Sequence, residues 1–214
     1  MQLYAHPFSS YSQKVLIALY ENQTPFEYRS LEDAAANAEL ASLWPIKRFP
    51  VLVDGGRTVL ETSTIIEHLQ IHHPGPVRMI PEGDAGVEVR MLDRIFDNYV
   101  MDNMQKVVLN QLRPAAERDP YGVAQARGFL DRIYLWLDAH LTDRTWAAGE
   151  AFTLADCGAA PSLFYADWAH GIPAALTQLR AYRARLLARP SMARAVDEAR
   201  PFRSYFPLGA PDRD

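Results

Sequence analysis

The sequence has little cysteine, and it has neither a long apolar run nor a cluster of basic residues. Cys157 is the only cysteine in the chain, so no disulfide can form within it, which is typical of a reducing compartment. A membrane-spanning helix needs about 18 consecutive apolar residues, and the sequence contains no such run. The N-terminal MQLYAHPFSS lacks the basic-then-apolar pattern of a secretory signal. We therefore expect a soluble, cytoplasmic protein.

Charge and missing motifs exclude further classes of function. The chain holds 22 Lys and Arg against 26 Asp and Glu, and its basic residues are scattered, so no footprint for nucleic acid is present. No Gly-x-Gly-x-x-Gly, P-loop or Gly-x-Ser-x-Gly motif occurs. Hydrophobic residues make up 49% of the 214 residues, enough to build the core of one large or two small domains.

The first third of the chain alternates between strand and helix patterns. Strands are predicted at residues 2–5, 26–30, 51–53 and 58–60, and helices at residues 10–21, 34–43 and 62–72. Ser10 and Gln13 predict a capping box at the start of the first helix. Asp54-Gly55-Gly56 predicts a hairpin turn. The resulting order, βαβ, α, ββα, is that of a thioredoxin-like domain.

The segment HPGPVRMIPEGD, residues 73–84, is rich in proline and glycine and reads as a linker. Beyond it the strand patterns stop, and helices are predicted at residues 87–113, 121–141, 153–168, 176–187 and 191–199. The helix at residues 153–168 is apolar almost all round, so we expect it to be buried. We predict a thioredoxin-like domain at residues 1–76, a linker at residues 77–84 and an all-helical domain at residues 85–214.

Pro50 stands at the front of a strand that should be buried, although proline cannot donate to a sheet ladder. In a thioredoxin-like domain a proline opens this strand with a cis peptide bond, so we expect the Phe49–Pro50 bond to be cis. The backbone N–H and C=O of Val51 would then pair with an extended peptide ligand.

Four segments resemble the cytosolic glutathione transferases. They are LYAHPFSSYSQKVLIALYE (residues 3–21), WPIKRFPVL (44–52), LETSTIIEHL (60–69) and FTLADCGAAP (152–161), and the resemblance extends over nearly the full chain. It is closest to serine-type bacterial members, with some zeta-like and theta-like features. It implies the glutathione transferase fold, glutathione as co-substrate, a homodimer and a role in detoxification.

The resemblance implies that a serine ionises the glutathione thiol. The serine-type classes place the activating hydroxyl six residues before the position of Val15, which is Ser9; Ser10 is the alternative. Ser10 is the better predicted cap, which leaves Ser9 free. A catalytic cysteine is not implied, because Cys157 lies within the predicted buried helix.

Two loops would hold the rest of glutathione. Arg48, or alternatively Lys47, would meet the glycyl carboxylate. Phe49, Pro50 and Val51 would hold the peptide backbone.

The start of the helix at residues 62–72 would hold the other end of the tripeptide. Glu61 would accept a hydrogen bond from the γ-glutamyl ammonium group. Thr62 would offer its N–H and hydroxyl to the γ-glutamyl carboxylate at the helix N-terminus.

The resemblance also implies a pocket between the domains for a hydrophobic electrophile. Its predicted lining is aromatic and methionine-rich: Tyr11, Tyr99, Met101, Met104, Tyr165 and Trp168. We expect a glutathione transferase that presents the thiolate to such an electrophile. Two alternatives stay open: a glutathione-dependent cis–trans isomerase of the zeta type, and a binding protein that uses the fold without catalysis.

Two further motifs carry predictions of other kinds. Thr153 and Asp156 predict a capping box with a structural role. His68 and His72 lie four residues apart on a helix, but no third ligand stands at a suitable spacing, so no metal site is predicted.

Overall fold

A four-stranded mixed sheet organises the first part of the chain in the computed structural model, which describes residues 1–214. The strand order is β2-β1-β3-β4: β1 (Gln2–Ala5) runs parallel to β2 (Glu27–Ser30) and antiparallel to β3 (Val51–Asp54), which pairs with β4 (Arg57–Val59). The β3–β4 hairpin closes through Gly55 and Gly56, both at positive φ, as a two-residue turn of the primed type requires.

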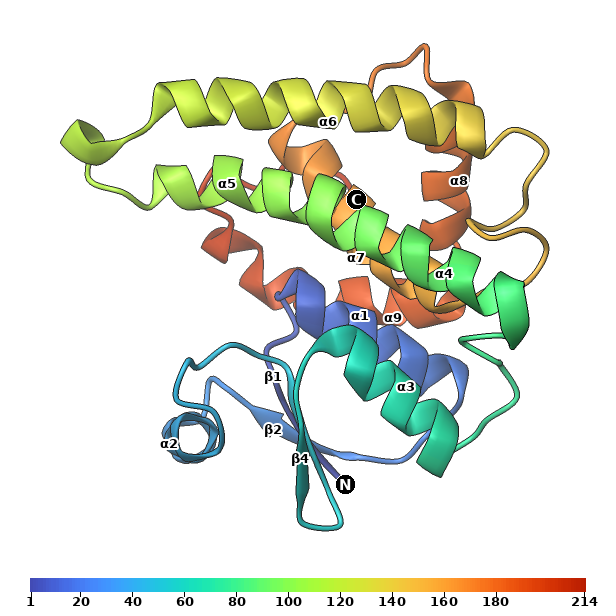
Figure 1. The fold of residues 1–214 in the computed structure, drawn as a ribbon. Helices are drawn as coiled ribbons and strands as arrows, with labels where there is room; N and C mark the ends of the chain where they lie inside the picture. The colour runs from blue at the N-terminus through green and yellow to red at the C-terminus, as the bar shows by residue number, and fades with distance from the viewer.

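Three helices cover the two faces of this sheet: α1 (Ser10–Glu21), α2 (Ala34–Leu43) and α3 (Thr62–His72). Successive residues of β1 point to opposite faces. Leu3 therefore joins the main core with α1 and α3, whereas Tyr4 packs with Leu40 of α2 in a smaller cluster. Figure 1 shows α2 standing apart from α1 and α3, which lie toward the helical part of the molecule.

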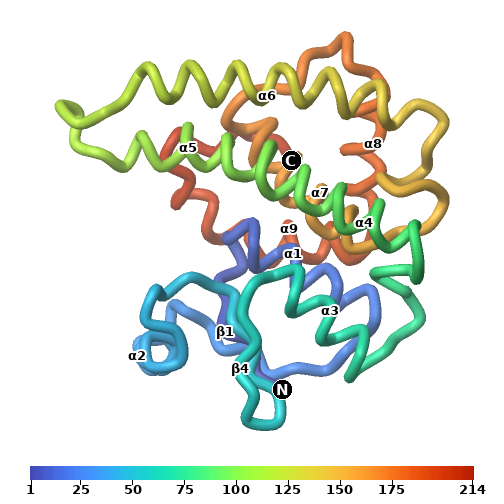
Figure 2. Tube along the Cα trace, viewed as in Figure 1, coloured from blue at the N-terminus to red at the C-terminus, as the bar shows by residue number.

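The rest of the chain is helical, and the predicted order of an α/β part followed by an all-helical part is confirmed. Its helices are α4 (Gly83–Ile95), the π-helix η1 (Phe96–Met101), α5 (Asp102–Gln111), the 3-10 turn η2 (Ala115–Glu117), α6 (Pro120–His140), α7 (Leu154–Ala169), α8 (Thr177–Leu187), α9 (Pro190–Ala199) and the 3-10 segment η3 (Arg200–Tyr205). The trace in Figure 2 shows α7 running through the middle of this part, between α6 and α1. None of these helices is both long and apolar enough to cross a membrane.

The predicted capping box at the start of α7 is confirmed. Asp156 is fully buried, and its carboxylate accepts hydrogen bonds from the Thr153 N–H (2.8 Å) and hydroxyl (3.1 Å). It also accepts from the Ala147 N–H (2.8 Å) and the Tyr182 hydroxyl (2.6 Å). The box thus ties the start of α7 to the preceding loop and to α8.

The predicted single helix at residues 87–113 is continuous, but it changes pitch in the middle. Residues Phe96–Met101 form a π-helix between α4 and α5. Such a turn adds one residue to the helix. The residues after it therefore face about one position away from where an uninterrupted α-helix of the same sequence would place them. Such π-turns occur often at functional sites.

A buried ion cluster joins the two parts of the molecule below this π-helix. The Lys14 ammonium group on α1 is fully buried, and it lies 2.5 Å from Asp93 Oδ1, 2.8 Å from Asp97 Oδ2 and 3.1 Å from the Ser63 hydroxyl. Gly158 of α7 faces this cluster, and a Cβ there would stand 3.2 Å from Asp93 Oδ1. The absence of a side chain at position 158 therefore lets α7 pack closely over the ion cluster.

Candidate functional site

A cavity of about 440 Å³ lies where the α/β part meets the turn between α4 and α5. The residues that the α/β part contributes include most of those predicted to activate or hold glutathione: Ser9, Arg48, Phe49, Pro50, Glu61 and Thr62. Tyr11, predicted for the electrophile pocket, lines the cavity as well. They come from the start of α1, the loop before β3 and the start of α3. The fold thus gathers at one place residues that lie up to 53 positions apart in the sequence, counting from Ser9 to Thr62.

Ser9, not Ser10, caps α1. The predicted Ser10–Gln13 box is wrong: Ser9 has the extended φ and ψ of an N-cap, and its hydroxyl accepts a hydrogen bond from the Ser12 N–H at 3.3 Å. The Gln13 side chain instead donates to the Pro7 carbonyl. Ser10 is buried in the first helical turn and does not line the cavity, whereas Ser9 does. The Ser9 hydroxyl accepts one bond, and its own proton stays available to a ligand in the cavity.

The phenol of Tyr11 lies in the cavity but cannot serve as an anion near neutral pH. Burial, assisted by the negative charges of Asp97, Asp102 and Glu61, raises the pKa of Tyr11 to about 12. The same carboxylates would oppose any other anion placed close to them. A thiolate in this cavity therefore needs a stabilising group of its own, at the Ser9 end.

The loop before β3 brings one of its two cations to the cavity. Arg48 lines the cavity with Phe49 and Pro50, and the Phe49–Pro50 peptide bond is cis. Lys47 is exposed, has a positive φ of 56° and does not line the cavity. Val51 is buried opposite Tyr4 in the ladder to β1, and it lies one residue beyond the ladder to β4, which begins at Leu52. The edge of β3 is therefore open at Val51 on its β4 side.

The start of α3 is built to receive an anion. Helix α3 begins at Thr62, and no side chain caps its first N–H groups. Unpaired N–H groups at a helix N-terminus form a ready site for a carboxylate. Glu61, the residue before, is held at φ 66°, a conformation that costs a non-glycine residue about 1–3 kcal/mol. Such strain is often found at ligand sites.

The wall that the helical part adds to the cavity is polar. It consists of Arg94, Asp97, Asn98, Asp102 and Gln105. The sequence patterns did not single out these residues. The signal that could have found them is the spacing of polar side chains along residues 94–105, at i, i+3, i+4, i+8 and i+11, which is that of one helix face.

The apolar wall predicted for this cavity is absent, and Tyr11 alone of the predicted lining residues reaches it. Met101, Met104 and Tyr165 are buried in the main core; Trp168 packs against that core, and Tyr99 is 53% exposed to solvent. Asp102, five residues after Asp97 across the π-turn, lines the cavity, whereas Met101 is fully buried on the core side. The positions of Tyr165 and Trp168 on α7 are independent of that turn.

Charge pairing holds this polar wall in place. The Arg94 guanidinium donates to Asp97 at 2.5 Å and to Asp93 at 2.8 Å, so the cavity wall is connected to the buried Lys14 cluster. Burial raises the pKa of Asp97, although the charges of Lys14 and Arg94 oppose the rise. Asp102 forms an exposed ion pair with Lys106 at 2.7 Å. The wall therefore offers hydrogen-bonding groups whose charges are largely paired.

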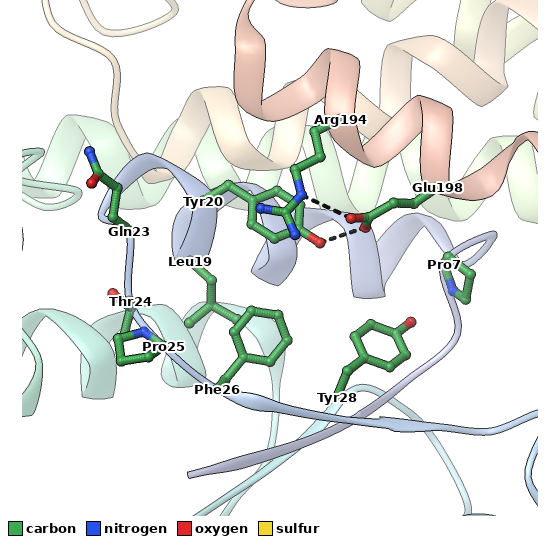
Figure 3. Close-up of a pocket in the computed structure, with 10 residues that line it drawn as sticks. All are labelled: Pro7, Leu19, Tyr20, Gln23, Thr24, Pro25, Phe26, Tyr28, Arg194 and Glu198. Carbon is green, nitrogen blue, oxygen red and sulfur yellow. Dashed lines mark hydrogen bonds and ion pairs between the residues drawn. The ribbon is translucent and has the colours of Figure 1, made fainter.

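A second, larger cavity lies away from these residues. It has a volume of about 680 Å³ and is formed by α1, the segment before β2 and α9, as Figure 3 shows. Tyr20 donates to Glu198 at 2.5 Å, and Arg194 lies over the Tyr20 ring. No serine and no uncapped helix start faces this cavity, so it lacks the features predicted for a glutathione site.

The structure also changes the interpretation of the histidines of α3. The rejection of a metal site rested on the His68 and His72 pair and on the lack of a third ligand. In the fold, His68 lies beside His73 and Asp54. These three side chains can present one ligand atom each, and the three atoms lie within 4.8 Å of one another. Asp54 comes from the β3–β4 hairpin, so the sequence spacing gave no sign of it.

Comparison with known proteins agrees with this geometry. A profile described as "Glutathione S-transferase, N-terminal domain" matches residues 3–77, and one described as "Glutathione S-transferase, C-terminal domain" matches residues 100–190.

Two curated relatives and one solved structure are similar over most of the chain. FtsZ-localized protein A of Caulobacter vibrioides is 29% identical over 80% of this chain and 79% of its own. A probable maleylacetoacetate isomerase of Vibrio cholerae is 28% identical over 93% of this chain and 96% of its own. A glutathione S-transferase from Methylobacterium radiotolerans, solved in complex with glutathione sulfonate, is 29% identical, with a TM-score of 0.79, over 91% of this chain and 93% of that one. With both domains matched and the fold shared, the chain belongs to the glutathione S-transferase family.

Proposed function

We propose that this protein binds glutathione in the 440 Å³ cavity and stabilises its thiolate with a hydrogen bond from the Ser9 hydroxyl, while the thiol proton leaves to solvent. The thiolate sulfur then forms a bond to an electrophilic carbon, either by addition to a double bond or by displacement of a leaving group. The observation that carries the proposal is the N-cap geometry of Ser9. Its oxygen accepts from the first turn of α1, and its proton is directed to no protein acceptor. A serine-type transferase needs such a hydroxyl, with an unused proton, at the head of a helix.

The energies involved are sufficient for this chemistry. A free thiol has a pKa of about 8.5, and lowering it by about two units takes roughly 2.7 kcal/mol. One hydrogen bond to a charged acceptor contributes about 1.5–3 kcal/mol, and a helix N-terminus adds about 0.3–1 kcal/mol. Ser9 supplies both effects together, so neither a metal ion nor a protein nucleophile is required.

The remaining contacts would orient the tripeptide. The uncapped N–H groups at Thr62 would hold the γ-glutamyl carboxylate, and Glu61 would accept from the ammonium group beside it. The open edge of β3 at Val51 would pair with the cysteinyl backbone, and Arg48 would meet the glycyl carboxylate. The ammonium group and the glycyl carboxylate then have partners of opposite charge, and the γ-glutamyl carboxylate has the N–H donors of a helix start.

The second substrate is expected to be polar rather than purely hydrophobic. The wall that faces the thiol position carries Asn98, Asp102 and Gln105, and no methionine reaches it. Polar groups left unpaired by an apolar ligand would cost roughly 1–3 kcal/mol each once they are buried. An electrophile with hydroxyl, carbonyl or carboxamide groups beside its reactive carbon satisfies this wall better.

The test is an ultraviolet difference titration of bound glutathione against pH. We expect a thiolate signal well below pH 8 in the natural protein and its loss in Ser9→Ala, with glutathione still bound. Ser10→Ala is the matched control, because Ser10 is the adjacent serine and lies outside the cavity. The assignment would be contradicted by a thiolate signal below pH 8 in Ser9→Ala, or by the loss of that signal in Ser10→Ala. Binding without early ionisation in the natural protein would indicate a non-catalytic member of the fold.

A cis–trans isomerase is the second candidate. It is favoured by the polar wall, and the similar protein of Vibrio cholerae is named a probable maleylacetoacetate isomerase. Transient addition of the same thiolate to a conjugated double bond would allow rotation, followed by release of glutathione. Turnover of maleylacetoacetate that depends on glutathione but consumes none of it would distinguish this reaction from transfer.

A further inference from the structure

We propose that Asp54, His68 and His73 form a binding site for one divalent transition-metal ion, for which Zn²⁺ is the best fit. The three residues can present two imidazole nitrogens and one carboxylate oxygen within 4.8 Å of one another. They are the only three such side chains in the structure that meet this condition. Two histidines and one carboxylate are a ligand set that zinc accepts, with the fourth position left to water.

The convergence is a product of the fold. Asp54 ends β3, His68 lies in the second turn of α3, and His73 is the C-cap residue of α3. Asp54 Oδ2 lies 2.9 Å from His68 Nε2 and 2.7 Å from His73 Nε2. Both rings thus point the same nitrogen at one carboxylate oxygen from two positions five residues apart. A regular helix face does not bring residues at that spacing together, but the break at the end of α3 does.

The distances suit a small cation. Ligands bound to zinc at about 2.0–2.1 Å in a tetrahedron are about 3.3 Å apart. The two separations between carboxylate and imidazole, 2.7 and 2.9 Å, are shorter by about half an ångström, and the two imidazole nitrogens lie within 4.8 Å of each other. Opening the cluster by this amount takes small torsional changes in three side chains, two of which reach the surface. In the metal-bound form the ion replaces the two N–H protons that the imidazoles now direct at Asp54.

The site is accessible, and it is separate from the thiol chemistry. The His73 side chain is 33% exposed and that of Asp54 18%, whereas His68 is buried and fixed. Thr62 at the start of α3 and His73 at its end are separated by eleven residues, about 16 Å along a helix. A bound ion would therefore clamp the β3–β4 hairpin to the far end of α3 without touching the glutathione position.

Other histidines of the chain lack this arrangement. His170 forms a pair with Asp131 at 2.7 Å, and His6 forms one with Glu32 at 2.9 Å, but neither pair has a third ligand. His72 lies beside His68, with ring centres 4.3 Å apart, but it is exposed and outside the group of three. These residues provide controls within the same protein.

The experiment is a calorimetric titration of the full, untagged, chelator-treated protein with ZnCl₂ near pH 7.5. We expect one ion per chain and a loss of affinity of at least about 100-fold in Asp54→Asn and in His73→Gln, because removal of a ligand costs no less than removal of its supporting partner. His72→Gln is the matched control, a neighbouring histidine whose change should leave the affinity within about twofold. Binding of Zn²⁺ should also raise the thermal midpoint of the natural protein and not that of His73→Gln.

A spectroscopic measurement identifies the ligands independently of calorimetry and thermal unfolding. Co²⁺ in place of zinc should give the intense visible absorption of a four-coordinate site, absent from Asp54→Asn. The proposal is overturned if neither ion binds at millimolar concentration, or if binding survives unchanged in both ligand variants. A circular-dichroism spectrum of each variant shows whether it is folded. If Asp54→Asn unfolds, His73→Gln still tests the proposal, because the His73 side chain is partly exposed and its replacement disturbs the core less.

Discussion

Replacement of Lys14 by methionine tests how the two parts of the molecule are held together. Lys14 is fully buried between Asp93 and Asp97, whose side chains are 2% and 7% exposed. Methionine keeps the length of the apolar stem and removes the charge. It leaves two buried carboxylates with the half-exposed Arg94 as their only cation. Breaking a buried ion pair from one side typically costs about 3–5 kcal/mol. Since Arg94 still offsets one negative charge, we expect about 3 kcal/mol.

The pH dependence gives this prediction a signature that a packing defect would not have. Burial already raises the pKa of Asp97 above its unfolded value, and loss of Lys14 raises it further. A carboxyl whose folded pKa is raised stabilises the fold below its unfolded pKa, near 3.9, and loses that contribution as pH rises through the folded pKa. The difference in unfolding free energy between Lys14→Met and the natural protein should therefore be larger at pH 8 than at pH 5.

Urea unfolding at both pH values measures these differences directly. Adding Asp97→Asn to Lys14→Met should restore a large part of the lost stability, because one of the two unpaired carboxylates is then neutral. A loss below about 1 kcal/mol, or a loss that is the same at both pH values and in the double variant, would refute the electrostatic reasoning.

Three further changes have outcomes that follow from the contacts. Asp156→Ala should cost at least about 3 kcal/mol in urea unfolding, more than the ~1–2 kcal/mol of a helix cap alone, because it strands two N–H groups and two hydroxyls; a loss under 1 kcal/mol would contradict this. Tyr11→Phe should move the pKa of the bound thiol by less than about half a unit in the ultraviolet titration, because the proposal assigns the hydrogen bond to the thiolate to Ser9; a shift as large as that of Ser9→Ala would give this role to the Tyr11 phenol, which stays protonated with a pKa of about 12. Arg48→Ala should weaken glutathione binding by about tenfold in calorimetry, the loss of one solvent-exposed charged contact; unchanged affinity would remove Arg48 from the site.

Local pattern predicted most of the elements of this fold. Helices α2 and α3 begin and end at the predicted residues, α2 because its sequence is rich in alanine and α3 because Ile65, Ile66 and Leu69 form an apolar face. The start of α1 was harder, since both Ser9 and Ser10 stand three residues before a polar side chain. Which serine caps the helix depends on where the backbone first becomes helical, and the path of the chain from β1 decides this.

Two features lay beyond the reach of the sequence patterns for a different reason. Met101 and Met104 were expected in the pocket because methionines form adaptable apolar walls, but both are buried in the core. The period of 3.6 residues also cannot reveal the residue that the π-turn adds between α4 and α5. The Asp54, His68 and His73 group depends on where a hairpin docks against a helix end. Such contacts between distant residues leave no spacing in the sequence.

The single added residue at Phe96–Met101 shows how this helix can absorb a change in length. A π-turn takes up one extra residue, so α4 and α5 on either side of it keep the facing that they would have in a regular helix one residue shorter. Deletion of one residue within the turn should therefore straighten the helix and leave the cavity wall, Asp102 included, in place. The π-turn thus separates the length of this helix from the side chains that it presents to the cavity.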